Sequence, residues 1–267
     1  MKKLKIVKVG GRLLTSKDIR LILSERIAGL KDNVIVVHGG GVVFDYYADK
    51  LGITTEKIDG RRITGEDARD LAVMTYAGLL NKQLVASINL ALEGKKNAIG
   101  LSGVDGMCIC AKKRSSIPIN MGCVADIKSV NSDIFIKLLN SSLVPVIAPV
   151  VADSNGELLN INADTLATSI AQEMSGSFEV ELYLLTETNG VIVSEKNKDK
   201  KASLRTLGKA SYQLLQHKGD IKGGMIAKLD AGFAAMEKGV NQVYIAHWQT
   251  LGFSHPFEGR ITELKTC

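Results

Sequence analysis

The sequence has no apolar run long enough to span a bilayer as a helix, so no membrane-spanning segment is predicted. The N-terminus, Met1-Lys2-Lys3, is basic, but further lysines interrupt the residues after it, whereas a secretory signal needs an apolar core. We therefore expect a cytoplasmic protein with no membrane partner.

Cysteine is scarce, and its spacing is not that of a zinc site. The cysteines are Cys108, Cys110, Cys123 and Cys267. The spacing of Cys108 and Cys110 points both side chains to one face of a strand, and no second pair or histidine cluster accompanies them. We expect reduced thiols and no metal site built by protein side chains.

A basic run interleaved with aromatic residues, which is typical of nucleic-acid-binding surfaces, is also missing. The formal net charge is +6, but the basic residues are scattered, and a small polyanionic ligand accounts for the excess as well. No nucleic-acid partner is predicted. With 45% hydrophobic and 23% charged residues, the 267-residue chain has the composition of a soluble globular protein. One large α/β domain or two lobes that share a sheet would fit its length.

The strongest local pattern is the apolar, mostly β-branched run Val34–Val37, which is followed by His38 and the glycines Gly39, Gly40 and Gly41. The pattern predicts a strand buried on both faces, then a tight turn into a helix over residues 42–51. Because glycine lets backbone N–H groups approach a ligand, the turn is a candidate phosphate cradle. A sharp turn without a ligand is the alternative at this point.

A similar unit begins the chain. Leu4–Val9 is strand-like and ends at Gly10-Gly11, and residues 16–30 have the apolar spacing of a helix capped by Ser16. Lys8 lies just before the glycine turn, where the carboxyl edge of an α/β sheet binds ligands. We interpret it as a site residue rather than a solvated edge-strand lysine, because its apolar neighbours are expected to be buried.

Residues 61–67 follow a predicted hairpin and lead into a long helix from Ala68 to about Glu93. Thr64 and Asp67 are interpreted as a capping box. Arg62 has no such structural role, and a guanidinium beside a helix start suits recognition of a carboxylate. Gly78 within the helix suggests close packing against another helix, of the same chain or of a second subunit.

The rest of the chain alternates between strands and helices. Strand-like segments are residues 98–106, which run into a glycine-rich loop, the ribbon 107–130, and the segments 143–150, 180–185 and 243–246, the last of which is expected to close the sheet. Helices are predicted over 165–174, capped by Asn162, and after Gly223-Gly224 as far as 237. Residues 195–205 are rich in lysine and are expected to form an exposed, mobile loop.

Glycine turns beside strands and helices, with lysines at two of them, indicate a phosphate-handling α/β protein outside the P-loop class. Their order, across almost the whole chain, closely resembles the amino acid kinase family. The motifs are Lys8-Val9-Gly10-Gly11, His38-Gly39-Gly40-Gly41, Arg62-Ile63-Thr64, Asn81-Lys82, Gly100-Leu101-Ser102-Gly103, Asn160-Ile161-Asn162-Ala163-Asp164 and Gly223-Gly224-Met225-Ile226-Ala227-Lys228.

The resemblance implies an α/β fold, a three-layer αβα sandwich with a central, mainly parallel sheet. It implies an N-terminal lobe, residues 1–175, for binding an acyl amino acid and for dimerisation, and a C-terminal lobe, residues 176–267, for binding ATP. The expected reaction is phosphoryl transfer from ATP to the side-chain carboxylate of an N-acylated glutamate in arginine biosynthesis. Mg²⁺ would be held through the phosphates and not by the protein.

The resemblance also assigns roles to matching residues. The catalytic residues would be Lys8, Lys228 and Asp164, the substrate-binding residues Gly40, Gly41, Arg62 and Asn160, and the nucleotide-binding residues Gly10, Gly11, Thr186, Asn189, Gly190, Gly223 and Gly224. A carboxylate nucleophile, with a pKa of about 4, is already ionised at neutral pH, so no general base is needed. Catalysis then requires alignment and charge neutralisation. Asp164 is expected to orient the lysines rather than accept a proton.

Three positions depart from the family pattern. Val42-Val43-Phe44 stands where a proline is typical, Val104 where a lysine is frequent, and Glu187 where an aspartate is frequent. Because the first departure is expected beside the acyl pocket, succinylated glutamate or carrier-linked aminoadipate is an alternative substrate. A kinase-fold ligand sensor without turnover is the alternative of another class. The segment after Ala246 matches poorly, and three residues in it are interpreted as packing or surface residues: His247, Trp248 and His255.

The resemblance extends to assembly. Family members inhibited by arginine carry an additional N-terminal helix before the first strand, and here the strand begins by Leu4. The helix from Ala68 to about Glu93 resembles the family's dimer contact. We therefore expect a homodimer that is insensitive to arginine, with a monomer, in which this helix packs within its own subunit, as the alternative.

Overall fold

The computed structural model describes the whole chain except residues 59, 195–200, 253–259 and 267. Its centre is an eight-stranded sheet of order β14-β16-β15-β11-β1-β2-β8-β5. Neighbouring strands in this sheet are parallel except for β15 and β16. The strands are β1 Lys3–Val9, β2 Asn33–His38, β5 Asn97–Ser102, β8 Leu143–Ala148, β11 Glu179–Thr186, β14 Thr206–Gly208, β15 Gln242–His247 and β16 Ile261–Lys265.

A four-stranded sheet and two hairpins complete the described strands. The smaller sheet contains β6 Ile109–Lys113, β7 Ala125–Val130, β9 Val150–Ala152 and β10 Leu158–Asn160, and the hairpins pair β3 Lys57–Ile58 with β4 Arg61–Arg62, and β12 Ile192–Ser194 with β13 Lys201–Ser203. The helices are α1 Lys17–Ala28, α2 Gly41–Leu51, α3 Glu66–Ala72, α4 Asn81–Leu92, α5 Ser132–Asn140, α6 Ala163–Met174, α7 Lys209–His217 and α8 Gly224–Glu237. Shorter helical segments are η1 Gly11–Leu14, η2 Val73–Leu80, η3 Asp105–Met107 and η4 Trp248–Thr250.

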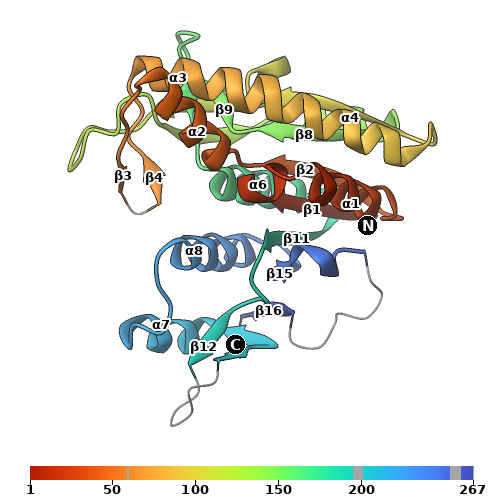
Figure 1. The fold of residues 1–267 in the computed structure, drawn as a ribbon. Coiled ribbons are helices and arrows are strands. Elements are labelled where there is room, and N and C mark those ends of the chain that lie inside the picture. The colour runs from red at the N-terminus through yellow and green to blue at the C-terminus, as the bar shows by residue number, and fades with distance from the viewer. Residues whose placement is uncertain (59, 195–200, 253–259, 267) are drawn as a thin grey trace.

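Helices cover both faces of the large sheet, because alternate residues of each strand point to opposite sides. Ile6 of β1 belongs to a buried cluster that includes Leu166 of α6 and Leu229 of α8. The next residue, Val7, belongs to a second cluster that includes Leu84 of α4. The predicted three-layer α/β architecture is therefore confirmed (Figure 1). Both clusters contain residues from either side of residue 175, so the proposed lobes share one sheet and its two apolar layers.

The first half of the chain folds largely as its pattern predicts. Ser16 caps α1, since its Oγ accepts a hydrogen bond of 3.4 Å from the backbone N–H of Ile19. Gly52 ends α2 in the left-handed conformation, with a φ of 69°. The long helix runs from Glu66 to Leu92 through α3, the π-helical segment η2 and α4.

The start of this long helix differs from the prediction. Gly65 is the N-cap residue and no side chain caps the helix, so the capping box of Thr64 and Asp67 is wrong. Thr64 instead donates to the carbonyl of Arg62 and accepts from Asn160, because the fold brings β10 beside it. Among the described residues, Gly78 packs against no other helix; a Cβ there would have the carbonyl oxygen of Val73, at 4.0 Å, as its one close neighbour.

The other differences concern strand ends. The sheet does not close at 243–246, because β16 and β14 extend it beyond β15. The predicted strand 143–150 stops at Ala148, and Val150 begins β9 in the smaller sheet. Cys108 has helical backbone angles and precedes β6, so it does not share a strand face with Cys110.

Some expectations concern residues that lie outside those the structure describes, namely His255, Cys267 and the lysine-rich residues 195–200. Residues 201–203 of the predicted loop form strand β13. Trp248 is buried in the second cluster, as a packing residue should be. Among the described helices, none combines the length and apolar character needed to cross a bilayer.

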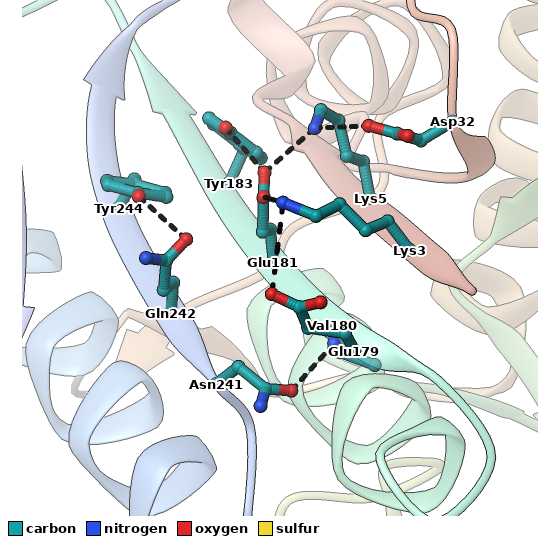
Figure 2. A network of polar contacts seen from close by, with 10 residues as sticks. All are labelled: Lys3, Lys5, Asp32, Glu179, Val180, Glu181, Tyr183, Asn241, Gln242 and Tyr244. Carbon is teal, nitrogen blue, oxygen red and sulfur yellow. Dashed lines mark hydrogen bonds and ion pairs between the residues drawn. The ribbon is translucent and has the colours of Figure 1, made fainter. Parts of the chain in front are cut away.

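A polar network occupies the amino end of β1 and β11 (Figure 2). Lys5 donates to Asp32 at 2.7 Å and to Glu181 at 2.9 Å, and the hydroxyl of Tyr183 donates to Glu181 at 2.9 Å. Burial alone would lower the pKa of Lys5, but the two carboxylates outweigh it and raise the pKa. This lysine of β1 is therefore fixed far from the carboxyl edge, where Lys8 lies.

Candidate active site

Lys8 lies at the carboxyl edge of the central sheet. It is the next to last residue of β1, and β11 and β2 pair with β1 on either side. The residue is only 6% exposed, which excludes a solvated edge-strand lysine.

Asp164 joins Lys8 to Lys228. It occupies the first turn of α6, where the side chain of Asn162 caps the helix by accepting from the backbone N–H of Asp164 at 2.8 Å. Lys8 Nζ lies 2.9 Å from Asp164 Oδ1, and Lys228 Nζ, from α8, lies 2.9 Å from Oδ1 and 3.0 Å from Oδ2. The structure thus brings together three predicted catalytic residues from three separate elements.

The charges of this cluster hold one another in place. Burial alone would raise the pKa of Asp164, but the ammonium groups of Lys8 and Lys228 outweigh it and lower the pKa to about 2. Burial, together with repulsion from Lys228, lowers the pKa of Lys8 to about 8 despite the attraction of Asp164. At neutral pH the cluster is one carboxylate between two ammonium groups, so Asp164 is not a proton acceptor and the cluster attracts anions.

The first two glycine turns touch each other beside Lys8. A Cβ on Gly11 would lie 2.6 Å from the backbone nitrogen of Gly40, and one on Gly40 would lie 2.4 Å from the ring of Tyr76. The backbone N–H of Gly39 donates to the carbonyl of Val9 at 2.9 Å and ties the turns together. Only glycine permits this approach of two backbones, and it leaves N–H groups at the sheet edge where an anion can bind.

A cavity opens at this edge. It is lined by Lys8, Gly11, Gly39, Gly40, Gly41, Lys57, Gly60, Arg61, Arg62, Tyr76, Arg114, Val124, Ala125, Pro149, Asn160, Ile161, Asn162, Ala163, Asp164 and Thr165. The predicted substrate residues therefore share one cavity with Lys8 and Asp164.

Arg62 is held in the cavity wall by its surroundings. Its guanidinium lies 4.1 Å from the centre of the Phe44 ring and donates to the side chains of Asp45 and Thr55. Phe44 is thus part of the support of Arg62, while Val42 and Val43 line a different hollow, beside Leu79. The departure Val42-Val43-Phe44 therefore does not face the substrate cavity directly.

Asn160 is positioned by two strands. Its backbone N–H donates to the carbonyl of Cys123 at 2.9 Å, and its Nδ2 donates to Thr64 Oγ1 at 3.1 Å. These contacts leave its amide oxygen available to a ligand in the cavity.

Gly223 and Gly224 lie at a second hollow, between α6 and α8. Gly223 has a φ of 57°, which favours glycine, and Gly224 begins α8, four residues before Lys228. The two hollows share Gly60, Arg61, Asn162 and Thr165, so they are adjacent. The N-terminus of α8 is therefore within reach of an elongated anion that also contacts Lys8.

The structure does not bring Thr186, Asn189 and Gly190 into either hollow. Thr186 ends β11, and Asn189 and Gly190 follow it; because β11 is next to β1, they lie at the same edge of the sheet. Gly190 has a φ of 66°, and a Cβ there would lie 2.5 Å from Thr262 Oγ1, which gives this glycine a packing role. Gly10 also lies at this edge and outside the cavity lining, and a Cβ there would lie 3.8 Å from the carbonyl oxygen of Leu185. Nucleotide binding by these residues stays a prediction.

Sequence reasoning missed several residues of the cavity wall, among them Lys57, Arg61, Tyr76 and Arg114. Tyr76 and Arg114 lie in a helix and a ribbon that carry no local signal of a site. It also gave no role to the His38 and Asn81 motifs. Asn81 Nδ2 lies 3.2 Å from His38 Nε2 and donates to the carbonyl of Val146 at 2.9 Å, so it fastens the long helix to the sheet behind the glycine turn. Burial lowers the pKa of His38 to about 4, and this histidine is neutral.

The other departures from the family pattern lie at the surface. Val104 is 37% exposed, and Glu187 pairs with Arg12 at 3.2 Å. Within the described residues, no group of three or more His, Cys, Asp and Glu side chains is arranged to hold a metal ion.

Comparison with known proteins identifies relatives across nearly the whole chain. The model of the amino acid kinase family matches residues 3–247. The acetylglutamate kinase of Cytophaga hutchinsonii is 38% identical over 252 residues, which are 94% of each chain. The acetylglutamate kinase of Parabacteroides distasonis is 36% identical over 245 residues, which are 92% of this chain and 94% of the relative. The N-acetylglutamate synthase of Neisseria gonorrhoeae, in complex with coenzyme A and L-arginine, shares the fold with a TM-score of 0.82 at 20% identity, over 100% of this chain and 62% of its own.

Proposed function

The chain belongs to the amino acid kinase family, and we propose that it acts as an N-acetylglutamate kinase in arginine biosynthesis. It would transfer the terminal phosphoryl group of ATP to the side-chain carboxylate of N-acetyl-L-glutamate. The observation that carries the proposal is the cluster in which Asp164 holds Lys8 and Lys228, beside a cavity that also contains Arg62 and Asn160.

The chemistry of the cluster suits this reaction. An oxygen of the substrate carboxylate bonds to the γ-phosphorus, the bond to the β,γ-bridging oxygen breaks, and ADP leaves with the electron pair. The nucleophile is already ionised at neutral pH, so no residue has to remove a proton. Two anions must instead be brought together, and the ammonium groups of Lys8 and Lys228 reduce their repulsion and stabilise the transferred phosphoryl group.

The remaining residues position the substrates. Arg62 binds the α-carboxylate through a guanidinium already fixed over Phe44, and Asn160 binds the adjoining amide. Gly40 and Gly41 complete the acyl amino acid site. Backbone N–H groups of Gly10 and Gly11 and the start of α8 at Gly223 and Gly224 take the ATP phosphates. The acyl amino acid residues all lie in the proposed N-terminal lobe, residues 1–175. The ATP phosphates are taken by Gly10 and Gly11 of that lobe together with the start of α8 in the proposed C-terminal lobe, residues 176–267.

The side chains around Asp164 are consistent with a cation that binds together with the nucleotide and not directly to the protein. Asp164 is occupied by both lysines, so Mg²⁺ would be held by the β- and γ-phosphate oxygens rather than by a carboxylate of the protein. Bound there, it would neutralise phosphate charge. Lys8 and Lys228 then carry the part of that task that the protein supplies.

The direct test is ADP release with N-acetyl-L-glutamate, ATP and magnesium, with hydroxylamine to trap the acyl phosphate. We expect turnover that depends on the acyl amino acid, and little with unacylated L-glutamate, whose charged amine replaces the amide. Binding of both ligands without ADP release would indicate the alternative, a kinase-fold sensor, and would contradict the proposal.

A further inference from the structure

The substrate cavity has more positive charge than an acetylated substrate uses. Its described lining contains Lys8, Lys57, Arg61, Arg62 and Arg114, and Asp164 is the one acid among these lining residues. In the proposed function, Lys8 faces the phosphoryl group and Arg62 the α-carboxylate. Lys57 pairs at 2.8 Å with Asp45, which also accepts from Arg62. Arg114 pairs with Asp126, which lies outside the lining, and no step of the proposed function uses this arginine.

Arg114 lies on the side of the cavity next to Asn160. It directly follows β6, and its backbone N–H donates to the carbonyl of Val124 at 2.7 Å. Val124 in turn forms a parallel β-bridge with Asn160. Three adjacent backbone segments therefore place Arg114, Val124 and Asn160 side by side along the wall. An acyl group attached to an amide bound at Asn160 would have Val124 and Arg114 beside it on this wall of the cavity.

The guanidinium of Arg114 is oriented before any ligand arrives. Asp126, on the facing strand β7, accepts from Nε of Arg114 at 3.0 Å and also from Nη2. Both bonds go to the same oxygen, Oδ1, and Nη1 remains available to donate to a ligand. The Arg114 side chain is only 24% exposed. A fixed, half-buried guanidinium in a cavity wall is suited to a carboxylate, because charge-assisted hydrogen bonds to it lose little freedom on binding.

An acetyl group ends in a methyl, so beyond its amide carbonyl it offers this guanidinium no acceptor. A longer acyl group with a terminal carboxylate does. We propose that Arg114 is a specificity-determining residue that recognises a carboxylate at the end of the substrate's acyl group, so that N-succinyl-L-glutamate is a substrate as well as N-acetyl-L-glutamate. The inference rests on the proposed function and leaves its chemistry unchanged, since the phosphoryl group still goes to the glutamate side chain next to Lys8.

The test compares kcat/KM for N-acetyl-L-glutamate and N-succinyl-L-glutamate in the wild-type protein, in Arg114→Gln and in Arg114→Lys. Arg114→Gln should lower kcat/KM for the succinylated substrate by about 10- to 100-fold, the usual range for hydrogen bonds to a charged group, and by less than about twofold for the acetylated one. Arg114→Lys should restore part of the loss, because it keeps the charge without the planar fork. Lys113→Gln is the matched control, since Lys113 is exposed and outside the cavity lining.

Retained activity with the acetylated substrate shows that a variant is folded. Equal loss with both substrates would overturn the assignment of Arg114. So would a wild-type protein that phosphorylates the acetylated but not the succinylated substrate, a result that needs no variant. Failure of the wild-type protein with both substrates would instead contradict the proposed function.

Discussion

Strand β1 shows how one residue type takes on different tasks at two ends of a sheet. Lys5 is neutralised by Asp32 and Glu181 at the amino end, whereas Lys8 shares Asp164 with a second lysine at the carboxyl end. The first arrangement is one ammonium group between two carboxylates, whereas the second is one carboxylate between two ammonium groups and has an excess positive charge. That excess, in a buried place, is what a phosphate-handling site requires.

Lys8→Met should reduce kcat by far more than it raises either KM. The ammonium group is most useful when charge moves onto the transferred oxygens, and the loss should be about 2 to 4 kcal/mol in the barrier, or roughly 30- to 800-fold. Steady-state kinetics with both substrates varied would measure it. Lys3→Met is the control on the same strand, because the Lys3 side chain is 50% exposed and distant from the cavity. A folded Lys8 variant with near-normal kcat would remove this lysine from catalysis.

The lowered pKa of Lys8 predicts an alkaline limb in the pH profile. A lysine is charged below its pKa, so activity that needs the charged form falls as pH rises through about 8. The limb should appear in kcat/KM for ATP, because this parameter reports the pKa values of the free enzyme. In kcat, which reports the enzyme–substrate complex, the limb should move to higher pH, because bound phosphates favour the ammonium form of Lys8. In Lys8→Arg any remaining activity should lack this limb, since arginine stays charged. An unchanged limb in that variant would assign the titration to another group.

The convergence of Lys8, Asp164 and Lys228 could be expected through the resemblance to the amino acid kinase family, and each also stands near a glycine turn or a helix start. Arg114 and Tyr76 could not be expected in this way. Nothing local distinguishes Arg114 from the neighbouring lysines, and its place in the cavity depends on contacts with Val124 and Asp126 across the ribbon. Thr64 failed as a cap for the same reason, since its partner Asn160 is 96 residues away.

At the scale of elements, the contact between the first two turns determines the shape of the proposed phosphate site. The turn after β1 and the turn after β2 are joined by the hydrogen bond from Gly39 to Val9, and Gly11 packs on the backbone of Gly40. Neither backbone can yield without moving a strand end. The site is therefore sensitive to a single methyl group at this contact.

Gly11→Ala should lower the melting temperature and kcat/KM together, whereas Gly10→Ala should leave the melting temperature nearly unchanged. An added Cβ on Gly11 lies 2.6 Å from Gly40, while one on Gly10 has its nearest neighbour at 3.8 Å. Overpacking of this kind costs about 1 to 3 kcal/mol. Thermal unfolding and kinetics of the two variants would measure the difference. Equal melting temperatures for both variants would show that the turns are not held in contact.

Helices and strands were predicted correctly where the apolar pattern and the glycines that end a segment indicate the same boundaries. The prediction failed where strands are short. Strands are recognisable from the sequence where a buried apolar run is followed by a glycine, as in β1, β2 and β11. Strand β16, Ile261–Lys265, alternates with polar residues and pairs only with β14 and β15, so its segment gave no signal of its own. The end of β8 at Ala148 was missed because the apolar run continues through Pro149 into β9.

At the scale of the whole molecule, the active site depends on a contact between the two proposed lobes. Asp164 and Lys8 precede residue 175, and Lys228 follows it, yet the central sheet is continuous across that boundary. Helices α6 and α8, which carry Asp164 and Lys228, face each other over the second hollow. A movement of α8 relative to β1 would change the distance between Lys228 and Lys8, and an anion bound by both lysines would favour the arrangement in which they are close.

The surface of the long helix leads to the final prediction, a homodimer. Met74 is 59% exposed and Leu79 is 37% exposed, and Val42 and Tyr46 of α2 are 40% and 53% exposed. Leu79, Val42 and Tyr46 share one hollow, and Gly78 beside them offers a close approach to a partner helix. An exposed apolar surface of this kind favours association, and a two-fold contact through it closes on itself.

Light scattering over a dilution series should therefore give twice the mass of one chain for the wild-type protein. Leu79→Arg places a charge where the partner would pack, so it should give the mass of one chain at micromolar concentrations. Leu214→Arg is the matched control, because Leu214 of α7 is also exposed, at 60%, but lies in a separate helix. It should remain a dimer. A wild-type monomer throughout the series, or a dimer in Leu79→Arg, would show that this surface is not the interface.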